Sequence, residues 1–255
     1  MVTGLASINA KAVSVSYPVY SGRSRSLKAQ LLRTVGGRLS VEEDRLTVKA
    51  LENVSVSLGS GDRVALIGGN GAGKSTLLRV LAGILEPTSG ELHKRGHVSS
   101  LLDMSMGMDP EATGYENIVM RSVFLGATFG EARARTAEIE EFSDLGDYLN
   151  LPMRTYSAGM RLRLSFAIAM AVQPEVLVID EMIAAGDAAF AAKAHARLQE
   201  VVNRLEILIL ATHDLGMAQT MCTRGLVLHH GQLVADTSVD EAIAFYQDLE
   251  NTPTA

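Results

Sequence analysis

The chain has 255 residues, of which 47% are hydrophobic and 20% are charged, and this composition excludes an intrinsically disordered protein. The net charge of −6 argues against nucleic acid as a partner, because nucleic-acid binders usually carry a pervasive basic surface. The single cysteine, Cys222, excludes an internal disulfide and favours a reducing compartment. No apolar run approaches the roughly 18 residues of a membrane-spanning helix, and residues 1–10 lack a secretory pattern.

The first 42 residues contain a predicted strand and a basic insertion. Residues 8–16 alternate apolar with polar side chains and predict a strand, and residues 21–40 predict an insertion with a short amphipathic helix. Six basic residues and no acidic one precede Glu42: Lys11, Arg23, Arg25, Lys28, Arg33 and Arg38. Two interpretations are open. The insertion is either a solvated basic surface or a helix beneath a membrane, where it meets anionic headgroups or a lipid-linked pyrophosphate.

The next segment is a strand, a glycine loop and a helix. Residues 46–58 predict a strand, and the short apolar run 63–67 is typical of a strand buried in a parallel sheet. The loop GGNGAGKS at 68–75 fits the pattern G-x-x-x-x-G-K-[ST], and a predicted helix follows to residue 85. Such a loop turns backbone N–H groups toward phosphate oxygens. Lys74 adds a positive charge for the β- and γ-phosphates, and the Ser75 hydroxyl is a ligand for Mg²⁺.

The remainder alternates helices and strands after a long helical insert. Residues 113–172 are mostly helical in pattern, including 131–142. The later strands and helices are predicted at 176–179, 188–205, 207–211, 214–221 and 225–229. Alternation of this kind predicts an α/β fold with parallel strands, and the helical insert indicates a lobe with its own task.

A pair of carboxylates follows the strand at 176–179. Asp180 at the end of an apolar strand lies where ligands bind in α/β sheets, and it is expected to hold Mg²⁺. Glu181 is the expected proton acceptor for an attacking water molecule, or orients that water.

The order of further motifs resembles a known family. The sequence YSAGM at 156–160 precedes a predicted helix, Asp187 follows Glu181, and Thr212-His213-Asp214 ends the next strand. This order resembles the ATP-binding cassettes of ABC transporters over residues 8 to about 246. The resemblance implies one ABC-type P-loop ATPase domain over 1–255, with a RecA-like core, an N-terminal antiparallel β subdomain and an inserted α-helical subdomain at about 104–172.

The resemblance also implies a head-to-tail homodimer that buries two ATP molecules. Ser157 and Gly159 would contact the γ-phosphate of the partner's ATP, His213 would align the attacking water, and Tyr17 would stack on adenine, with Tyr20 as a rival. The expected ATP contacts are Tyr17, Gly68, Asn70, Gly71, Ala72, Gly73, Lys74, Ser75, Thr76, Ser157, Gly159 and Asp187. The expected catalytic residues are Glu181, His213 and Lys74, and the expected Mg²⁺ ligands are Ser75, Asp180 and Asp103.

Departures from the common cassette point to a subfamily. The usual Leu-Ser-Gly-Gly-Gln signature is YSAGM here, and the usual glutamine is replaced by a segment in which Asp103 is the candidate. Both features resemble the ATPases that export lipid-linked polysaccharides such as O-antigen, capsule and teichoic acid. Because the chain ends at Ala255, we expect it to lack the carbohydrate-binding β-sandwich that some members carry.

The subfamily resemblance implies an ATPase that works with two copies of a membrane permease. The ATPase would lie peripherally on the cytoplasmic face of the inner membrane, and a lipid-linked polysaccharide would be the transported substrate. An ATPase subunit of another ABC exporter, for lipids or drugs, is the alternative. A soluble ABC ATPase that acts on ribosomes or DNA is a third interpretation.

Overall fold

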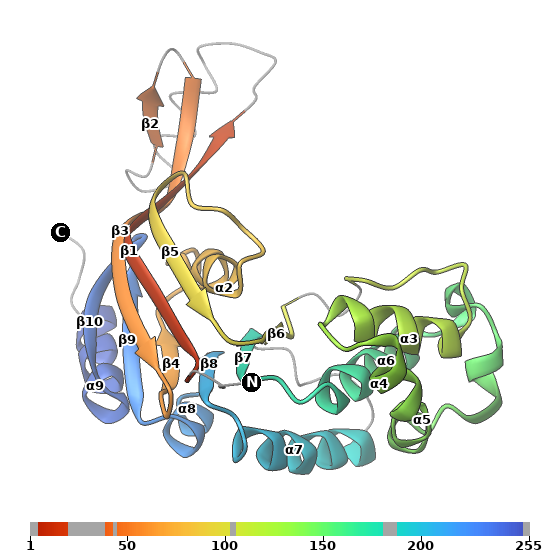
Figure 1. Ribbon diagram of the computed structural model, residues 1–255. Helices are drawn as coiled ribbons and strands as arrows, with labels where there is room; N and C mark the ends of the chain where they lie inside the picture. Colours follow the sequence, from red (N-terminus) through yellow and green to blue (C-terminus); the bar gives the residue numbers. More distant parts are fainter. Residues whose placement is uncertain (1–4, 20–38, 43–44, 103–105, 181–187, 252–255) are drawn as a thin grey trace. The chain divides into compact units, whose positions relative to one another are not determined.

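The computed structural model describes residues 5–19, 39–42, 45–102, 106–180 and 188–251 (Figure 1). The chain divides into two compact units, and each is described by itself below. Unit 1 comprises Met1–Arg95 and Ile209–Ala255, and unit 2 comprises Gly96–Leu208. In the described parts of both units, no helix is long and apolar enough to cross a membrane.

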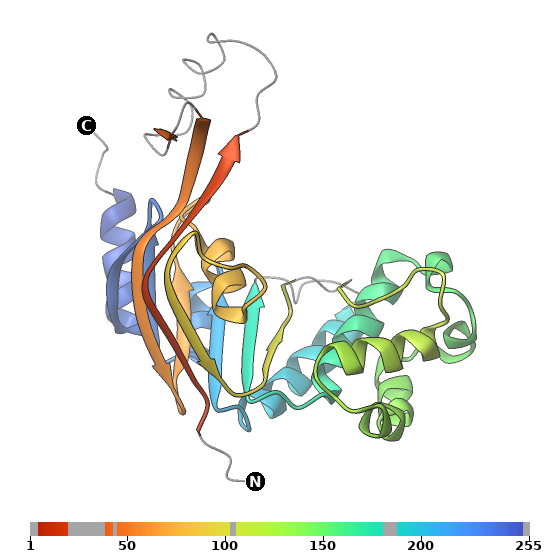
Figure 2. The same ribbon diagram turned by 45° about the horizontal axis from the view of Figure 1, so that its top comes forward.

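Unit 1 contains an antiparallel sheet in the order β2-β3-β1-β5 (Figure 2). Its strands are β1 (Ser7–Val19), β2 (Leu39–Glu42), β3 (Arg45–Gly59) and β5 (Ser89–Arg95). Apolar residues alternate along β1 because one face of the sheet is buried, and Ile8 and Val13 are fully buried there. The expected strands at 8–16 and 46–58 are therefore present as β1 and β3, each longer than expected. The basic insertion at 21–40 lies outside the described residues up to position 38, and its last two residues belong to β2.

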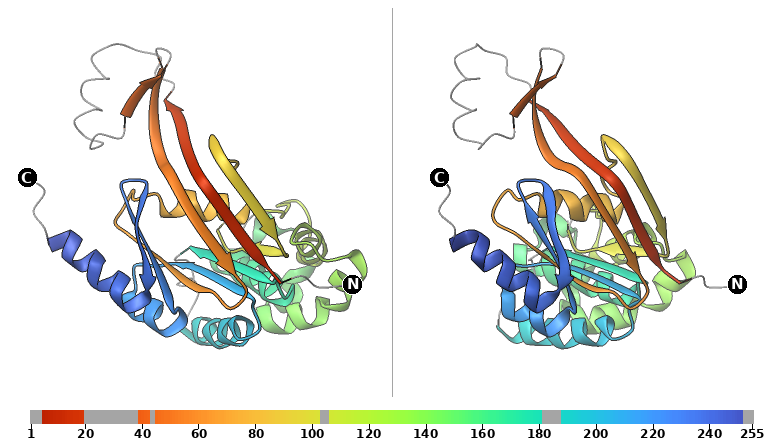
Figure 3. Two further views of the ribbon diagram at one scale, coloured as in Figure 1. Left: turned by 60° about the vertical axis from the view of Figure 1, so that its left-hand side comes forward. Right: turned by 90° about the vertical axis from the view of Figure 1, so that its left-hand side faces the viewer.

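Unit 1 also holds parallel strands and the helices that pack on them (Figure 3). Strand β4 (Arg63–Ile67) pairs in parallel with β9 (Arg224–His229), and β9 pairs antiparallel with β10 (Gln232–Ser238). The helices are α2 (Lys74–Ala82), α8 (Leu215–Met221) and α9 (Val239–Asn251). Helix α2 ends earlier than expected because Gly83 adopts a left-handed conformation with φ 77°. Strand β8 (Ile207–Ala211) includes residues of both units.

Unit 2 joins a parallel strand pair to a group of helices (Figure 1). Strand β6 (Val98–Ser100) pairs in parallel with β7 (Val176–Asp180). The helices are α3 (Gly114–Phe124), α4 (Phe129–Ala134), α5 (Thr136–Ser143), α6 (Ala158–Ala171) and α7 (Ala188–Val202), with the 3₁₀ turns η1 (Gly146–Asn150) and η2 (Met153–Thr155). Capping boxes start α3 at Thr113 and α4 at Thr128. Residues 131–142 are helical as expected apart from Arg135, which separates α4 from α5.

Three aromatic rings pack together between helices α5, α6 and α7 of unit 2. The ring of Phe142 stacks on that of Phe166 at a centroid distance of 6.0 Å. Phe190 packs edge-on against both rings, at 5.9 Å and 6.1 Å. The guanidinium of Arg163 lies 5.1 Å from the centre of the Phe190 ring and covers that side of the cluster. Helices α5, α6 and α7 therefore share one core.

Candidate nucleotide-binding site

The glycine loop of unit 1 connects the end of β4 with the start of α2, as the sequence predicts. Gly68 has φ 154°, and a β-carbon there would lie 2.4 Å from the Leu228 carbonyl oxygen. Gly73 has φ 107°, and a β-carbon there would lie 2.7 Å from the Ala50 carbonyl oxygen. Any side chain at either position would strike backbone, so both ends of the loop require glycine. Close backbone packing therefore explains Gly68 and Gly73 of the motif.

Hydrogen bonds from neighbouring turns fix the shape of the loop. The Ala72 N–H donates to the Gly69 carbonyl at 3.1 Å, which closes a turn inside the loop. Gly231, in the turn between β9 and β10, donates its N–H to the Ala72 carbonyl at 2.9 Å. The Gly231 carbonyl accepts in turn from the Glu52 N–H at 2.8 Å. The loop is therefore preorganised by β3 and the β9–β10 turn.

Lys74 is buried and its ammonium group turns back onto the loop. Its Nζ donates to the Gly68 carbonyl at 2.5 Å and to the Gly69 carbonyl at 3.2 Å. Only 9% of Lys74 is exposed, so these carbonyls replace water around the charge. Asn70, Gly71 and Ser75 are exposed around it. The N-cap Gly73 brings no side chain to α2, so no side chain caps the start of this helix. The N-terminus of a helix favours an anion such as a phosphate.

His213 lies in the same unit, two residues after β8. The buried Thr212 accepts a hydrogen bond from the Asp214 N–H at 3.0 Å, and Asp214 caps α8 by accepting from the Met217 N–H at 3.0 Å. These two bonds fix the backbone on either side of His213. The His213 side chain itself is exposed to solvent.

Tyr17 occupies an exposed position on β1. Its backbone pairs with Val48 of β3, and 39% of the residue is exposed. An exposed ring on a rigid strand is available for stacking, so the structure is compatible with the predicted adenine contact. Tyr20, the rival, lies outside the described residues.

In unit 2, Asp180 is the last residue of β7. Residues 176–179 are buried, whereas Asp180 is half-buried, so the strand delivers its carboxylate to the edge of the core. The Asp180 carboxylate and the Ser75 hydroxyl are oxygen donors of the kind that Mg²⁺ prefers, and Ser75 is exposed to receive a ligand. Glu181, Asp187 and Asp103 lie outside the described residues.

The signature segment forms the N-terminus of α6. Ser157 is the N-cap, and its Oγ accepts from the Met160 N–H at 3.2 Å. Ser157 and Ala158 are exposed, and around Gly159 only Ser157 Oγ lies within 4 Å of a built β-carbon, at 3.9 Å. The site at this helix end is therefore open to a ligand, as predicted for a contact with phosphate.

Tyr156, which departs from the common signature, has a structural role. It is only 3% exposed, and its hydroxyl donates to the Tyr148 carbonyl at 2.7 Å. Burial raises the pKa of Tyr156, so the hydroxyl stays a donor. A β-carbon on Gly114 would lie 2.3 Å from that hydroxyl. The tyrosine thus fills the space between η1 and the start of α3.

Two residues near the loop were missed by sequence reasoning. Tyr246 and Glu250 of α9 place their oxygens 3.9 Å and 3.8 Å from a β-carbon built on Gly69. They lie more than 170 residues after the loop in sequence, and only the i, i+4 spacing links them to each other. No signal in the sequence connects them to the loop.

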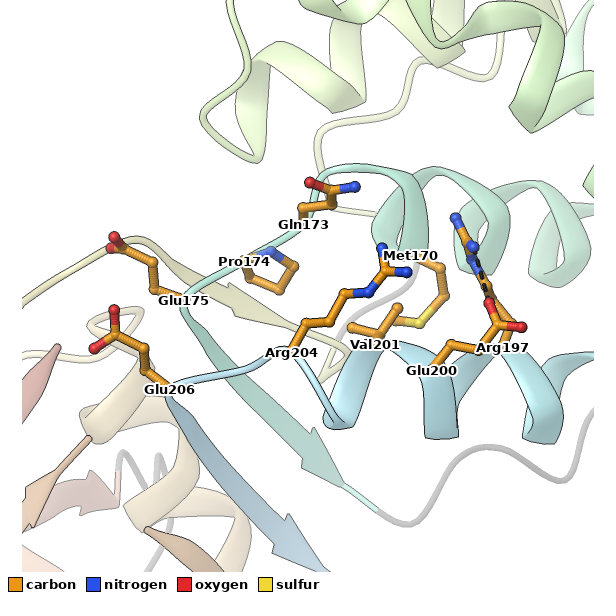
Figure 4. A pocket seen from close by; sticks show the side chains of 9 residues that line it. All are labelled: Met170, Gln173, Pro174, Glu175, Arg197, Glu200, Val201, Arg204 and Glu206. Carbon is orange, nitrogen blue, oxygen red and sulfur yellow. Dashed lines mark hydrogen bonds and ion pairs between the residues drawn. The ribbon is translucent and has the colours of Figure 1, made fainter. Parts of the chain in front are cut away.

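Unit 2 also has a pocket of about 210 Å³ near the start of β7 (Figure 4). Arg204 extends its guanidinium along this pocket, and Arg197 forms an ion pair with Glu200 at 3.1 Å. The pocket lies at the Glu175 end of β7, whereas the candidate ligand Asp180 lies at the other end of the strand. The pocket is therefore separate from Asp180.

Comparisons with known proteins agree with this geometry. Residues 51–184 match the family model described as ABC transporter. The chain is 47% identical over 232 residues to the "O-antigen export system ATP-binding protein RfbE" of Yersinia enterocolitica, covering 90% of this chain and 97% of the relative. It is 33% identical to the "Teichoic acids export ATP-binding protein TagH" of Listeria monocytogenes serotype 4b (strain F2365), covering 95% of this chain and 70% of the relative.

A solved structure shows the same fold. The "Dimeric structure of a post-hydrolysis state of the ATP-binding cassette MJ0796 bound to ADP and Pi" superposes with a TM-score of 0.67 at 20% identity. The match covers 91% of this chain and 98% of that one. The predicted α/β fold of an ATP-binding cassette is confirmed. With the glycine loop, the strand that ends in Asp180 and the signature helix in place, the chain belongs to the ABC transporter family as an ATP-hydrolysing subunit.

Proposed function

We propose that this chain hydrolyses ATP to power the export of a lipid-linked polysaccharide, of the O-antigen or capsule type, across the cytoplasmic membrane. The observation that carries the proposal is the 47% identity to an O-antigen export ATP-binding protein over 90% of the chain. The identity extends well beyond the nucleotide motifs. The relative named as a teichoic acids export ATP-binding protein supports a role in export.

ATP binds at the glycine loop in this proposal. The buried ammonium of Lys74 exchanges the carbonyls of Gly68 and Gly69 for oxygens of the β- and γ-phosphates. Ser75 and Asp180 would hold Mg²⁺, which would supply positive charge beside the phosphates. Glu181 accepts the proton of the attacking water, His213 aligns that water, and Tyr17 stacks on adenine.

Two copies of the chain complete the site. Ser157 and Gly159 are accessible at the N-terminus of α6, where backbone N–H groups attract anions. In a head-to-tail homodimer these residues of one subunit contact the γ-phosphate bound to the loop of the other, and Asp187 lies at the interface. The related cassette of known structure is described as dimeric, which supports a dimer of this chain.

The membrane permease docks on the helical part of unit 2. A hollow of about 630 Å³ beside α3 and α4 is lined by both apolar and acidic side chains. Met120 and Phe129 are 38% and 64% exposed there, and Glu111 and Glu116 lie at the same hollow. An exposed apolar surface rimmed by charge is typical of a protein interface. The chain is then a peripheral subunit on the cytoplasmic face of the inner membrane, with two permease copies per ATPase dimer.

The experiment is complementation of a strain that lacks the gene. Wild-type protein restores polysaccharide at the cell surface. Lys74→Ala leaves the polymer inside the cell on its lipid carrier, because the loop no longer binds nucleotide productively. Surface polysaccharide that persists without the gene, together with loss of drug or lipid efflux, would assign the ATPase to another exporter.

A further inference from the structure

Helix α9 is fixed against the strands that support the glycine loop. Val239, Ala242 and Ile243 are buried on its inner face, and Ala242 is fully buried. A β-carbon on Gly225 of β9 would lie 2.3 Å from the Ala242 β-carbon, so glycine permits a close approach of helix and strand. Figure 3 shows α9 running beside the β9–β10 hairpin. This packing sets which side chains the last turns of α9 present to the loop.

The last turns of α9 present a tyrosine and a glutamate. Tyr246 is half-buried, and its hydroxyl donates to Glu250 Oε1 at 2.5 Å. Burial, and then the neighbouring Glu250, raise the pKa of Tyr246 to about 12, so its hydroxyl is a donor throughout the physiological range. Among the residues that the structure describes, the Glu250 carboxylate forms no ion pair. The carboxylate is therefore held by a hydroxyl group.

One residue of the loop, Gly69, accepts a hydrogen bond from Lys74 and lies near the α9 pair. The Gly69 carbonyl accepts from Lys74 Nζ at 3.2 Å. A β-carbon built on the same residue would lie 3.8 Å from Glu250 Oε1 and 3.9 Å from the Tyr246 hydroxyl, with no other atom within 4 Å. The negative charge of Glu250 thus lies beside the loop that would receive a polyphosphate.

We infer that Glu250, held in place by Tyr246, lowers the affinity of the glycine loop for nucleotide, and does so more for ATP than for ADP. The physical cause is repulsion between the carboxylate and the phosphates, which increases with the number of charges on the nucleotide. Both groups are near solvent, so the effect is modest and depends on salt. The inference rests on the proposed nucleotide site at residues 68–75, and it assigns the C-terminal helix a role in nucleotide exchange.

The test is equilibrium binding of ATP and of ADP to the full chain in the presence of EDTA, which prevents hydrolysis. Glu250→Gln is expected to tighten ATP binding about threefold and ADP binding about twofold at about 0.05 M NaCl, and the gain should shrink at about 0.5 M NaCl. Tyr246→Phe is expected to give a smaller gain, because the released carboxylate spends less time beside Gly69. Asp248→Asn is the matched control, since it removes the same charge from α9 at a residue that does not approach Gly69.

Two results with the variants would overturn the inference. The first is that the Glu250→Gln variant binds nucleotide no more tightly than wild type, or more weakly. This result would mean that Tyr246 and Glu250 only support the structure of the loop. Alternatively, Asp248→Asn tightens binding as much as Glu250→Gln does, which would assign the effect to net charge alone. A wild-type chain that binds neither nucleotide would instead refute the proposed site.

Discussion

Tyr156 occupies the space that a side chain at position 114 would need, since a β-carbon on Gly114 would lie 2.3 Å from the Tyr156 hydroxyl. The same β-carbon would lie 2.9 Å from the Leu149 Cα, which is backbone and cannot swing aside. Gly114 at the start of α3 and Tyr156 before the signature serine are therefore packed directly against each other. A change at either residue disturbs the other.

The first prediction concerns that contact. Gly114→Ala is expected to lower the free energy of unfolding by about 1–3 kcal/mol, because the methyl group overpacks a closed site. Gly130→Ala is the matched control, because it lies in α4 with nothing within 4 Å of its β-carbon, and it is expected to stabilise by about 0.5–1 kcal/mol. Urea unfolding of the two variants measures both effects. Equal effects of the two substitutions would contradict the packing argument.

The second prediction separates the structural role of Ser157 from its role in hydrolysis. Ser157→Ala removes the N-cap of α6 and is expected to cost about 1 kcal/mol of stability. It should also slow ATP hydrolysis, because the hydroxyl no longer contacts the γ-phosphate in the partner's site. Thr128→Ala removes the N-cap of α4 and should cost about the same stability, about 1 kcal/mol, while hydrolysis is retained. If both variants lose hydrolysis equally, Ser157 has only a capping role.

The third prediction concerns Glu181. Glu181→Gln is expected to bind ATP and to dimerise, but to lose most turnover, because an amide cannot accept the proton of the attacking water. Size-exclusion chromatography with ATP and a phosphate-release assay test the two halves of this statement. Hydrolysis at the wild-type rate would remove Glu181 from the mechanism.

The fourth prediction is a pH dependence of stability. Hydrogen bonds from the Thr113 backbone and side chain lower the pKa of Glu116, and those from Thr128 lower the pKa of Glu131. A carboxylate with a lowered folded-state pKa contributes stability above its unfolded-state pKa, and this contribution is lost as the pH falls through the folded-state pKa. Unfolding measured from pH 6 downward should therefore show less loss of stability on acidification for the double variant Glu116→Gln and Glu131→Gln. If the double variant loses as much stability as wild type on acidification, other carboxylates determine the pH dependence.

Sequence patterns located two of the buried strands with both boundaries. Residues 63–67 and 207–211 were predicted as strands and are β4 and β8. Continuous apolar runs bounded by turns leave few alternatives. The break at Arg135 was not predictable, because Ala132 and Ile139 are seven residues apart and both are buried. Residues seven positions apart lie on the same face of a helix, so the pattern of buried residues looks the same with or without the break.

Other features depend on tertiary contacts. Strand β5 is almost entirely exposed and polar, so no hydrophobic alternation marks it, and it is a strand because it pairs with β1. The glycine loop was predictable because its residues are contiguous and each type is required by the chemistry. The position of Glu250 near Gly69 was not predictable, since only the packing of α9 brings these distant segments together.

The hydrogen bonds of the Lys74 ammonium group have a consequence for folding. Its ammonium group is hydrogen-bonded to two loop carbonyls, which take the place of water around this buried charge. We therefore expect newly made subunits to reach the native state in buffer without ATP. Folding would then not depend on ATP binding. A subunit that has released its product would keep its structure until it binds the next nucleotide.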